Sequence, residues 1–307
     1  PAIHIVTSRP VVLKNLSIQY KTQTKLNNGY IPYASPPVAV YAIRGNLLIE
    51  NCTFKGTDND ESPCAVLATA ESSVQIKDCR FDGFNYTIQI ADQSSADIKN
   101  CLIINPGHCG VTVGTGSSAT LKNNIISGSH YHGIRCTGGK ITADSNLIAD
   151  NKNRGIYIGN QSATGTLSNN VIIDNATGIN VFADSKLTIV NNVILRSTYA
   201  GLSISDTATL DIRNNVIANN ERGVVGFSTV KGDIPSINLR GENIFYDNTT
   251  QSEGIKQPSE MVGLDPQFKN PSAGLFALAT TETKEMGISN PTDMQLLWDK
   301  WKMAISR

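Results

Sequence analysis

A cluster of histidine, arginine and tyrosine residues between positions 108 and 157 carries the side chains best suited to acid–base chemistry in this sequence. Three of the four histidines, His108, His130 and His132, lie within it. A histidine or tyrosine can move a proton, and an arginine can hold a carboxylate and lower the pKa of the neighbouring C–H. The cluster therefore indicates proton abstraction beside a carboxylate. The residues expected at this site are His132, Arg135 and Tyr157 as catalytic groups, and Arg154, Asn180, His108 and Tyr131 as substrate-binding groups.

Two aspartates suggest other chemistry at the same corner. Asp150 and Asp174 each come four residues after an asparagine of a repeated pattern, on consecutive repeats. They could hold Ca²⁺ or form the acid and base pair of a glycoside hydrolase. Aspartates at a bend also cap backbone amides without any catalytic role. His130 and His132 have a spacing that permits metal binding on a strand, but the sequence offers no third ligand.

A periodic glycine defines the elements that must position these residues. Each glycine of the series opens a short apolar run, and successive members are 22 or 23 residues apart: Gly110, Gly133, Gly155, Gly178, Gly201 and Gly223. Within one unit, residues 155–158, 165–168 and 170–173 are short and rich in β-branched residues, as expected for strands. One such unit cannot bury its own apolar residues, whereas stacked copies share a core. We predict an all-β, right-handed, single-stranded parallel β-helix of nine or ten coils.

An asparagine series with nearly the same period supports this interpretation. Its members precede aliphatic pairs: Asn124, Asn146, Asn170, Asn192 and Asn215. An inward amide is costly if unpaired, but stacked amides can donate to one another and to the backbone. Earlier in the chain the same slot holds Cys52, Cys79 and Cys101, and later Asn243. These three cysteines and Cys136 are predicted to point into the core. Most of the six cysteines are predicted to be free thiols, and spacing alone does not determine disulfides.

The ends of the chain differ from the repeats. We expect a parallel β-helix over residues 1–262, with a long loop or insertion near 20–40, and a tail with a packing helix over 263–307. Met294, Leu297 and Trp301 fall at helical spacing and predict an amphipathic helix that packs on the body or caps an end of the stack. Only the 20–40 and 226–260 segments are long enough to wall a groove.

Composition excludes several classes of protein. Lys plus Arg equals Asp plus Glu, so the formal net charge is zero, and a nucleic-acid binder is not expected. No apolar run is long enough to span a membrane. No signal peptide is present, and the chain opens at Pro1 in strand-like sequence, as in a processed or trimmed chain.

The repeated motif resembles a known family. Asn123-Asn124-Ile125-Ile126 followed by Gly133-Ile134, and its copy at 169–179, are similar to the pectin-lyase-like right-handed β-helix superfamily, especially the bacterial "right-handed β-helix region" proteins. The tail sequence Asp265-Pro266-Gln267-Phe268 is similar to that of secreted members. The motifs of polygalacturonases and of mannuronan epimerases are absent, since only His132-Gly133 of the former occurs.

This resemblance implies an extracytoplasmic protein, secreted or periplasmic, that acts on or binds a polysaccharide. The cluster described above then favours a polysaccharide lyase acting on an acidic glycan, with a glycoside hydrolase as the second enzymatic hypothesis. Ca²⁺ is the one cofactor considered. The alternative is a non-catalytic glycan-binding or structural ectodomain of a larger envelope protein, which the nearly uniform coil length between 101 and 225 favours. Substrate identity and oligomeric state stay open.

Overall fold

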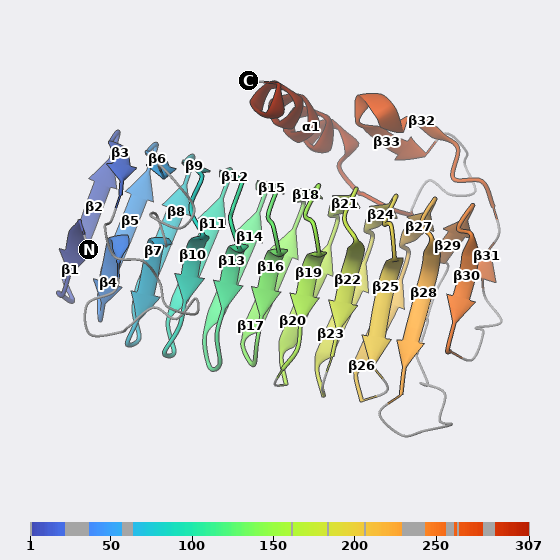
Figure 1. The fold of residues 1–307 in the computed structure, drawn as a ribbon, viewed down its shortest axis with the longest axis horizontal. Helices are drawn as coiled ribbons and strands as arrows, with labels where there is room; N and C mark the ends of the chain where they lie inside the picture. The colour runs from blue at the N-terminus through green and yellow to red at the C-terminus, as the bar shows by residue number, and fades with distance from the viewer. Residues whose placement is uncertain are drawn as a thin grey trace.

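The fold is an elongated stack of parallel strands with one helix beside it (Figure 1). A computed structural model describes residues 2–21, 37–56, 64–160, 162–182, 184–205, 207–228, 243–255, 261–262, 264–278 and 286–306. The predicted loop at 20–40 lies mostly outside these ranges, as does much of the candidate wall at 226–260. In the described part of the chain, no helix is long and apolar enough to cross a membrane.

Three parallel sheets run along the stack, and the described strands form sheets of eleven, nine and eleven members. Sheet A contains β1 (Ile3–Ile5), β4 (Val38–Ile43), β7 (Cys64–Thr69), β10 (Tyr86–Ile90), β13 (Cys109–Val113), β16 (His132–Cys136), β19 (Arg154–Ile158), β22 (Thr177–Val181), β25 (Ala200–Ser205), β28 (Arg222–Phe227) and β30 (Thr250–Glu253). Sheet B contains β2 (Pro10–Lys14), β5 (Asn46–Glu50), β8 (Ser73–Lys77), β11 (Ser95–Lys99), β14 (Ser118–Lys122), β17 (Lys140–Asp144), β20 (Thr164–Ser168), β23 (Lys186–Val190) and β26 (Thr209–Arg213). Sheet C contains β3 (Ser17–Tyr20), β6 (Thr53–Gly56), β9 (Arg80–Asp82), β12 (Leu102–Ile104), β15 (Ile125–Ser127), β18 (Leu147–Ala149), β21 (Val171–Ile173), β24 (Val193–Leu195), β27 (Val216–Ala218), β29 (Asn243–Tyr246) and β31 (Met261–Val262). One strand from each sheet makes a coil, which confirms the predicted parallel β-helix.

The repeated glycines are required by close approach between coils. A Cβ atom on Gly155 would lie 2.8 Å from the carbonyl oxygen of Gly178 and 3.0 Å from Nδ2 of Asn175. Gly133 and Gly201 meet equivalent atoms of the next coil at similar distances. Because real Cβ atoms are not found this close to other atoms, the coils could stack at this spacing only with glycine at these positions. The period of the glycines in the sequence therefore follows directly from the stacking of the coils.

The predicted asparagine column is confirmed as a hydrogen-bonded ladder inside the stack. Nδ2 of Asn146 donates to Oδ1 of Asn170 at 2.9 Å, and Nδ2 of Asn170 donates to Oδ1 of Asn192 at 2.9 Å. Each amide also donates to a backbone carbonyl, as Asn170 does to Ala143 at 2.9 Å. The ladder continues at its other end through the buried Cys101, whose backbone N–H donates to Asn124. All six cysteines are buried free thiols.

A second internal ladder, which the sequence analysis missed, runs along the turn between sheets C and A. Nδ2 of Asn151 donates to Oδ1 of Asn175 at 2.9 Å, and Nδ2 of Asn220 donates to Oδ1 of Asn248 at 3.0 Å. Ser129 and Ser197 occupy the same column and donate their backbone N–H groups to it. Two hydrogen-bonded columns of amides thus hold the turns between sheets B and C and between sheets C and A in register.

The C-terminal tail covers the apolar outer face of sheet C. From β12 to β29 this face carries buried aliphatic residues, on which Phe276, Met294, Trp298 and Trp301 pack. The tail comprises β32 (Phe268–Asn270), η1 (Pro271–Ala273), β33 (Leu275–Leu278) and α1 (Pro291–Ile305). Nε1 of Trp301 donates to Oγ of Ser127 at 2.9 Å, which fixes α1 against β15. The helix therefore packs along the side of the stack (Figure 1), and the end-capping alternative is wrong.

Replacing Asn170 by alanine should destabilise the protein substantially. The change leaves the backbone N–H of Asn146 without its acceptor, at about 1 to 3 kcal/mol for a buried unsatisfied group, and removes one of the acceptors of Asn146 Nδ2. We expect a clear fall in the midpoint of denaturant-induced unfolding. Thr120→Ala, an exposed change on sheet B, is the control and should alter stability by no more than about 0.5 kcal/mol. Equal midpoints for the two variants would contradict the ladder's stabilising role.

Candidate functional site

An open depression of about 470 Å³ on the outer face of sheet A brings together five of the nine predicted site residues. Its lining consists of Tyr131, His132, Arg135, Arg154, Tyr157, Asn160 and Phe182. The residues come from β16, β19 and the segments beside them, and from the end of β22, which Phe182 follows. Parallel pairing aligns His132 with Arg154 and Arg135 with Tyr157, so residues 22 apart become neighbours. The convergence follows from the coil register that the glycines enforce.

The two arginines of the depression are available to an anion. Arg154 lies over the ring of Tyr157, with its guanidinium carbon 5.3 Å from the ring centroid, and donates to Oδ1 of Asn153. Neither Arg154 nor Arg135 has a carboxylate partner among the described residues, whereas Arg196 and Arg222 are both in ion pairs. Two partly exposed cations without counter-charges make the depression suited to a ligand that carries carboxylates.

His132 is held in its neutral form at ordinary pH. Its side chain is 2% exposed and stacks on Tyr157 with ring centroids 4.9 Å apart. Burial, reinforced by the charges of Arg154 and Arg135, lowers its pKa to about 3. Its Nδ1 atom is buried and has no hydrogen-bond partner in the described part of the chain. A neutral imidazole can accept a proton, which is the role the sequence analysis gave to a base.

Tyr157 has the opposite tendency. Burial raises the pKa of its phenol, although Arg154 and Arg135 act against this effect. The hydroxyl donates to Oδ1 of Asn160, which also favours the protonated form. At neutral pH the imidazole is therefore unprotonated and the phenol protonated, which are the starting states of a general base and a general acid, although the lowered pKa also makes this imidazole a weak base.

Asn160 and Phe182 line the depression but escaped the sequence analysis. Both lie just after a strand of sheet A, so the repeat period does not mark them as functional. The sequence signal that could have revealed Asn160 is Gly159, the residue before it. A Cβ at Gly159 would lie 2.8 Å from Cβ of Phe182 and 3.2 Å from the Tyr157 hydroxyl. The glycine leaves room for both aromatic side chains.

Asn180 and His108 lie outside the lining of the depression. Asn180 is paired with Tyr157 in the sheet, but its side chain is only 1% exposed and donates to Oγ of Ser203 at 2.6 Å. The Asn180 side chain is therefore covered and bonded within sheet A, away from the depression. His108 is half-buried beside the depression and packs against Tyr131 with ring centroids 4.7 Å apart.

Asp150 and Asp174 also lie outside the depression. They occupy the corner after each sheet C strand, where φ is 53° and 59°, and Asn105 and Asn219 hold the same left-handed conformation on other coils. Asn and Asp adopt this conformation more readily than most residues, which accounts for both aspartates. Asp174 accepts two hydrogen bonds from Arg196, and Asp150 pairs with Lys152. The described residues contain no group of three or more His, Cys, Asp or Glu side chains that could hold a metal ion, and both aspartates are already engaged with a basic side chain.

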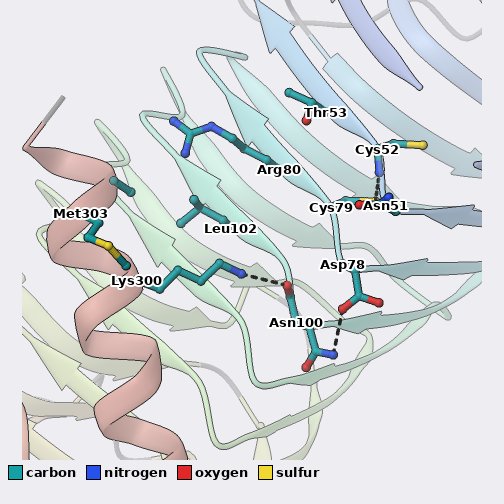
Figure 2. A pocket seen from close by; sticks show the side chains of 11 residues that line it. Asn51, Cys52, Thr53, Asp78, Cys79, Arg80, Asn100, Leu102, Lys300 and Met303 are labelled. Atoms are coloured by element: carbon teal, nitrogen blue, oxygen red, sulfur yellow. Dashed lines mark hydrogen bonds between the residues drawn. The ribbon is translucent and has the colours of Figure 1, made fainter. Parts of the chain in front are cut away.

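A second depression, of about 560 Å³, lies beneath the C-terminal end of α1 (Figure 2). Its polar groups bond mainly to one another: Lys300 donates to the backbone oxygen of Asn100, and Asn100 donates to Asp78 at 3.0 Å. None of the predicted site residues lines it. This depression lies where the helix extends beyond the apolar part of sheet C. At this point β9 presents the charged side chains of Arg80 and Asp82 rather than aliphatic ones.

Comparison with known proteins agrees with this geometry. The family "Right handed beta helix region" matches residues 109–282, and the chain belongs to this family. The family "Periplasmic copper-binding protein (NosD)" matches residues 14–161. No protein with curated annotation matches the chain significantly.

Several solved structures are similar to this chain. A double mutant of the periplasmic alginate epimerase AlgG has a TM-score of 0.60 and 14% identity, with 82% of this chain and 68% of that chain covered. Pectate lyase Pel9A has a TM-score of 0.47 and 11% identity, covering 88% and 90% of the two chains. PfbA, a surface adhesin of Streptococcus pneumoniae, has a TM-score of 0.46 and 14% identity, covering 92% and 79%. At such low identities these matches concern the fold alone.

The buried neutral His132 should make stability depend on pH. The unfolded chain protonates this imidazole near its ordinary pKa of 6.5, but the folded protein does so only near pH 3. The unfolded state therefore binds more protons between these values, and stability should fall as the pH is lowered from 6.5 to 3. We expect His132→Gln to flatten this fall in unfolding experiments across that range.

Two further variants test the assignment to His132. His108, whose pKa burial also lowers, contributes in the same direction, so some slope should survive in His132→Gln. The control is His130→Gln at an exposed position, which should retain the slope of the parent protein. A slope unchanged in His132→Gln and lost in His130→Gln would contradict the assignment.

Proposed function

We propose that this protein is an extracytoplasmic polysaccharide lyase that acts on an acidic glycan at the depression on sheet A. The observation that carries the proposal is the presence of Arg135 and Arg154 without carboxylate partners, beside a neutral imidazole and a protonated phenol. Such a set can neutralise a uronate and move two protons. The alginate epimerase AlgG, which has the same fold, is named for a polysaccharide, which is compatible with the proposal.

In the proposed reaction, the arginines bind the carboxylate of a uronic acid unit within the polymer. This lowers the pKa of the C5 proton, which His132 removes as the base. The electron pair of the C5–H bond forms a C4–C5 double bond, the bond from C4 to the glycosidic oxygen breaks, and Tyr157 donates its proton to the departing oxygen. When the carboxylate neutralises the two arginines, the part of the His132 pKa shift due to their charges diminishes, so the imidazole becomes a stronger base.

Glycoside hydrolysis fits the same depression less well. It requires two carboxyl groups flanking the scissile bond. The described residues that line the depression include no Asp or Glu, and Asp174 is held by Arg196. Copper, the metal in the name of the NosD family, also lacks a fitting set of His, Cys, Asp or Glu ligands among the residues that the structure describes. Nδ1 of His108 lies 3.0 Å from Sγ of Cys109, but burial raises the pKa of the Cys109 thiol to about 11 and keeps it protonated.

An extracytoplasmic location is compatible with the thiols of this chain. The NosD family and AlgG are both described as periplasmic. An oxidising compartment would oxidise exposed cysteine thiols. In this chain, burial raises the pKa of the Cys109 and Cys136 thiols to about 11. Because the thiolate is the reactive form, buried thiols of this kind resist oxidation.

One observation favours a second candidate function, the binding of an acidic glycan without catalysis. The His132 side chain is almost completely covered, so a substrate must displace part of its surroundings before C5 can reach it. The arginines and Tyr131, which is 40% exposed, need no such rearrangement to contact a ligand. In this case the protein would hold polyuronates as a surface module.

Incubation with polyuronates distinguishes the two functions. The lyase produces an unsaturated sugar, detected by ultraviolet absorption, together with new reducing ends, and Tyr157→Phe should reduce the rate at least about 100-fold while binding persists. Arg135→Ala should weaken both binding and turnover.

The matched control is Arg213→Ala, which removes an exposed arginine of sheet B and should change neither property. Binding that depends on Arg135, without any unsaturated product, would leave the binding function and exclude the lyase. If neither binding nor product is found with any polyuronate, both functions are excluded.

A further inference from the structure

A continuous series of aromatic rings extends beyond the depression on both sides. Adjacent ring centroids lie 4.6 Å apart for Tyr86 and His108, 4.7 Å for His108 and Tyr131, and 4.0 Å for Tyr131 and His132. Beyond the stacked pair of His132 and Tyr157, the separations are 6.2 Å to Phe182 and then 6.3 Å to Phe227. We call the residues Tyr86, His108, Tyr131, His132, Tyr157, Phe182 and Phe227 the aromatic track.

The aromatic track crosses sheet A diagonally. His108 and Tyr131 directly precede β13 and β16, and Tyr86 is the first residue of β10. Further along the stack, Tyr157 is the fourth residue of β19, Phe182 follows the last residue of β22, and Phe227 ends β28. The track thus passes from the leading to the trailing side of the sheet over six coil spacings of roughly 4.8 Å each.

A straight course along the stack would use different residues. The position directly before the sheet A strand is held by Tyr131 on one coil and by Tyr199 three coils later. Tyr199 is 40% exposed and has Arg222 over its ring at 5.1 Å, but it has no ring contact with the track in the described structure. Tyr199 and Phe227 therefore mark two alternative paths for a ligand that leaves the depression.

We infer that the aromatic track is an extended binding surface for a linear acidic polysaccharide, which crosses sheet A diagonally from Tyr86 to Phe227 with its carboxylates at Arg135 and Arg154. This inference rests on the proposed function and adds the length and path of the ligand. Two of these ring pairs are stacked and four are tilted by 33° to 42°, so a ligand meets ring edges together with the polar tips of Tyr and His, which suit a chain rich in hydroxyl groups. A pyranose unit is about as long as one strand spacing, roughly 4.8 Å, so the track offers about one ring per sugar.

The charge and the open course of the track favour this ligand over a compact one. The two free arginines lie in the middle of the track, so a bound chain can extend several units in both directions from them. Phe227, at one end, is 38% exposed, which leaves it accessible to such a chain. A single uronic acid or a disaccharide would occupy the depression without reaching either end.

The test measures the affinity of size-defined oligouronates, from disaccharide to octasaccharide, for the intact protein by calorimetry. Affinity should rise with length up to about the span of the track. Tyr86→Ala and Phe227→Ala should each weaken binding of the octasaccharide about three- to tenfold and leave the disaccharide unaffected. Tyr199→Ala is the matched control and should change neither affinity. Unfolding curves identify any variant that has lost its fold, and for such a variant the milder Phe227→Leu or Tyr86→Leu takes its place.

Several results would overturn the inference. If Tyr199→Ala weakens octasaccharide binding and Phe227→Ala does not, the ligand follows the straight path. Affinity that is independent of length would confine the ligand to the depression. Equal affinity for a single-stranded DNA oligomer, with the same dependence on the rings, would remove the assignment to a glycan. Failure of every oligouronate to bind would instead refute the proposed function itself.

Discussion

Axial stacking of the coils is the constraint on which the rest of the structure depends. Successive coils approach so closely that a Cβ on Gly133, Gly155 or Gly178 would lie within 2.8 Å of a carbonyl oxygen of the next coil. Two internal columns of amides then fix the register at both turns, because each amide donates to the coil that follows. A shift of one residue between coils would separate every amide from its partner and turn apolar residues outward. This register makes residues 22 to 24 apart neighbours, and the depression on sheet A is one product of it.

The same constraint determines which parts of the site the sequence could predict. Residues at fixed positions relative to the repeated glycine, such as Tyr131, His132 and Arg135, were expected to meet Arg154 and Tyr157, and they do. Asn180 has the right register, but its side chain is covered and bonded to Ser203, which no period can reveal. Asp150 has the predicted place in the repeat but lies at a left-handed corner, a conformation that Asp adopts readily, and the period alone does not distinguish such a corner residue from a ligand. The positions of Phe182 and Asn160 depend on how β22 and β19 end, and local packing determines where these strands end.

The tail illustrates a different limit. The helical spacing of Met294, Leu297 and Trp301 predicted an amphipathic helix, and its apolar side is buried through Met294, Trp298 and Trp301. Its position could not be predicted, because both the open end of the stack and the outer face of sheet C could bury it. The outer positions of β12 to β29 decide the matter, since they are aliphatic where β9 is charged. Reading both faces of each short strand of sheet C would have revealed this second apolar surface.

The central claim is that coil stacking builds, on the outer face of sheet A, a site for a carboxylate-bearing chain. The most direct measurement is a crystal structure of the protein with an oligouronate long enough to span six coils. The account predicts ligand density over β16 and β19, with a carboxylate in contact with the guanidinium of Arg135 or Arg154. Density over sheet B or beneath α1, with the arginines of sheet A left untouched, would contradict it.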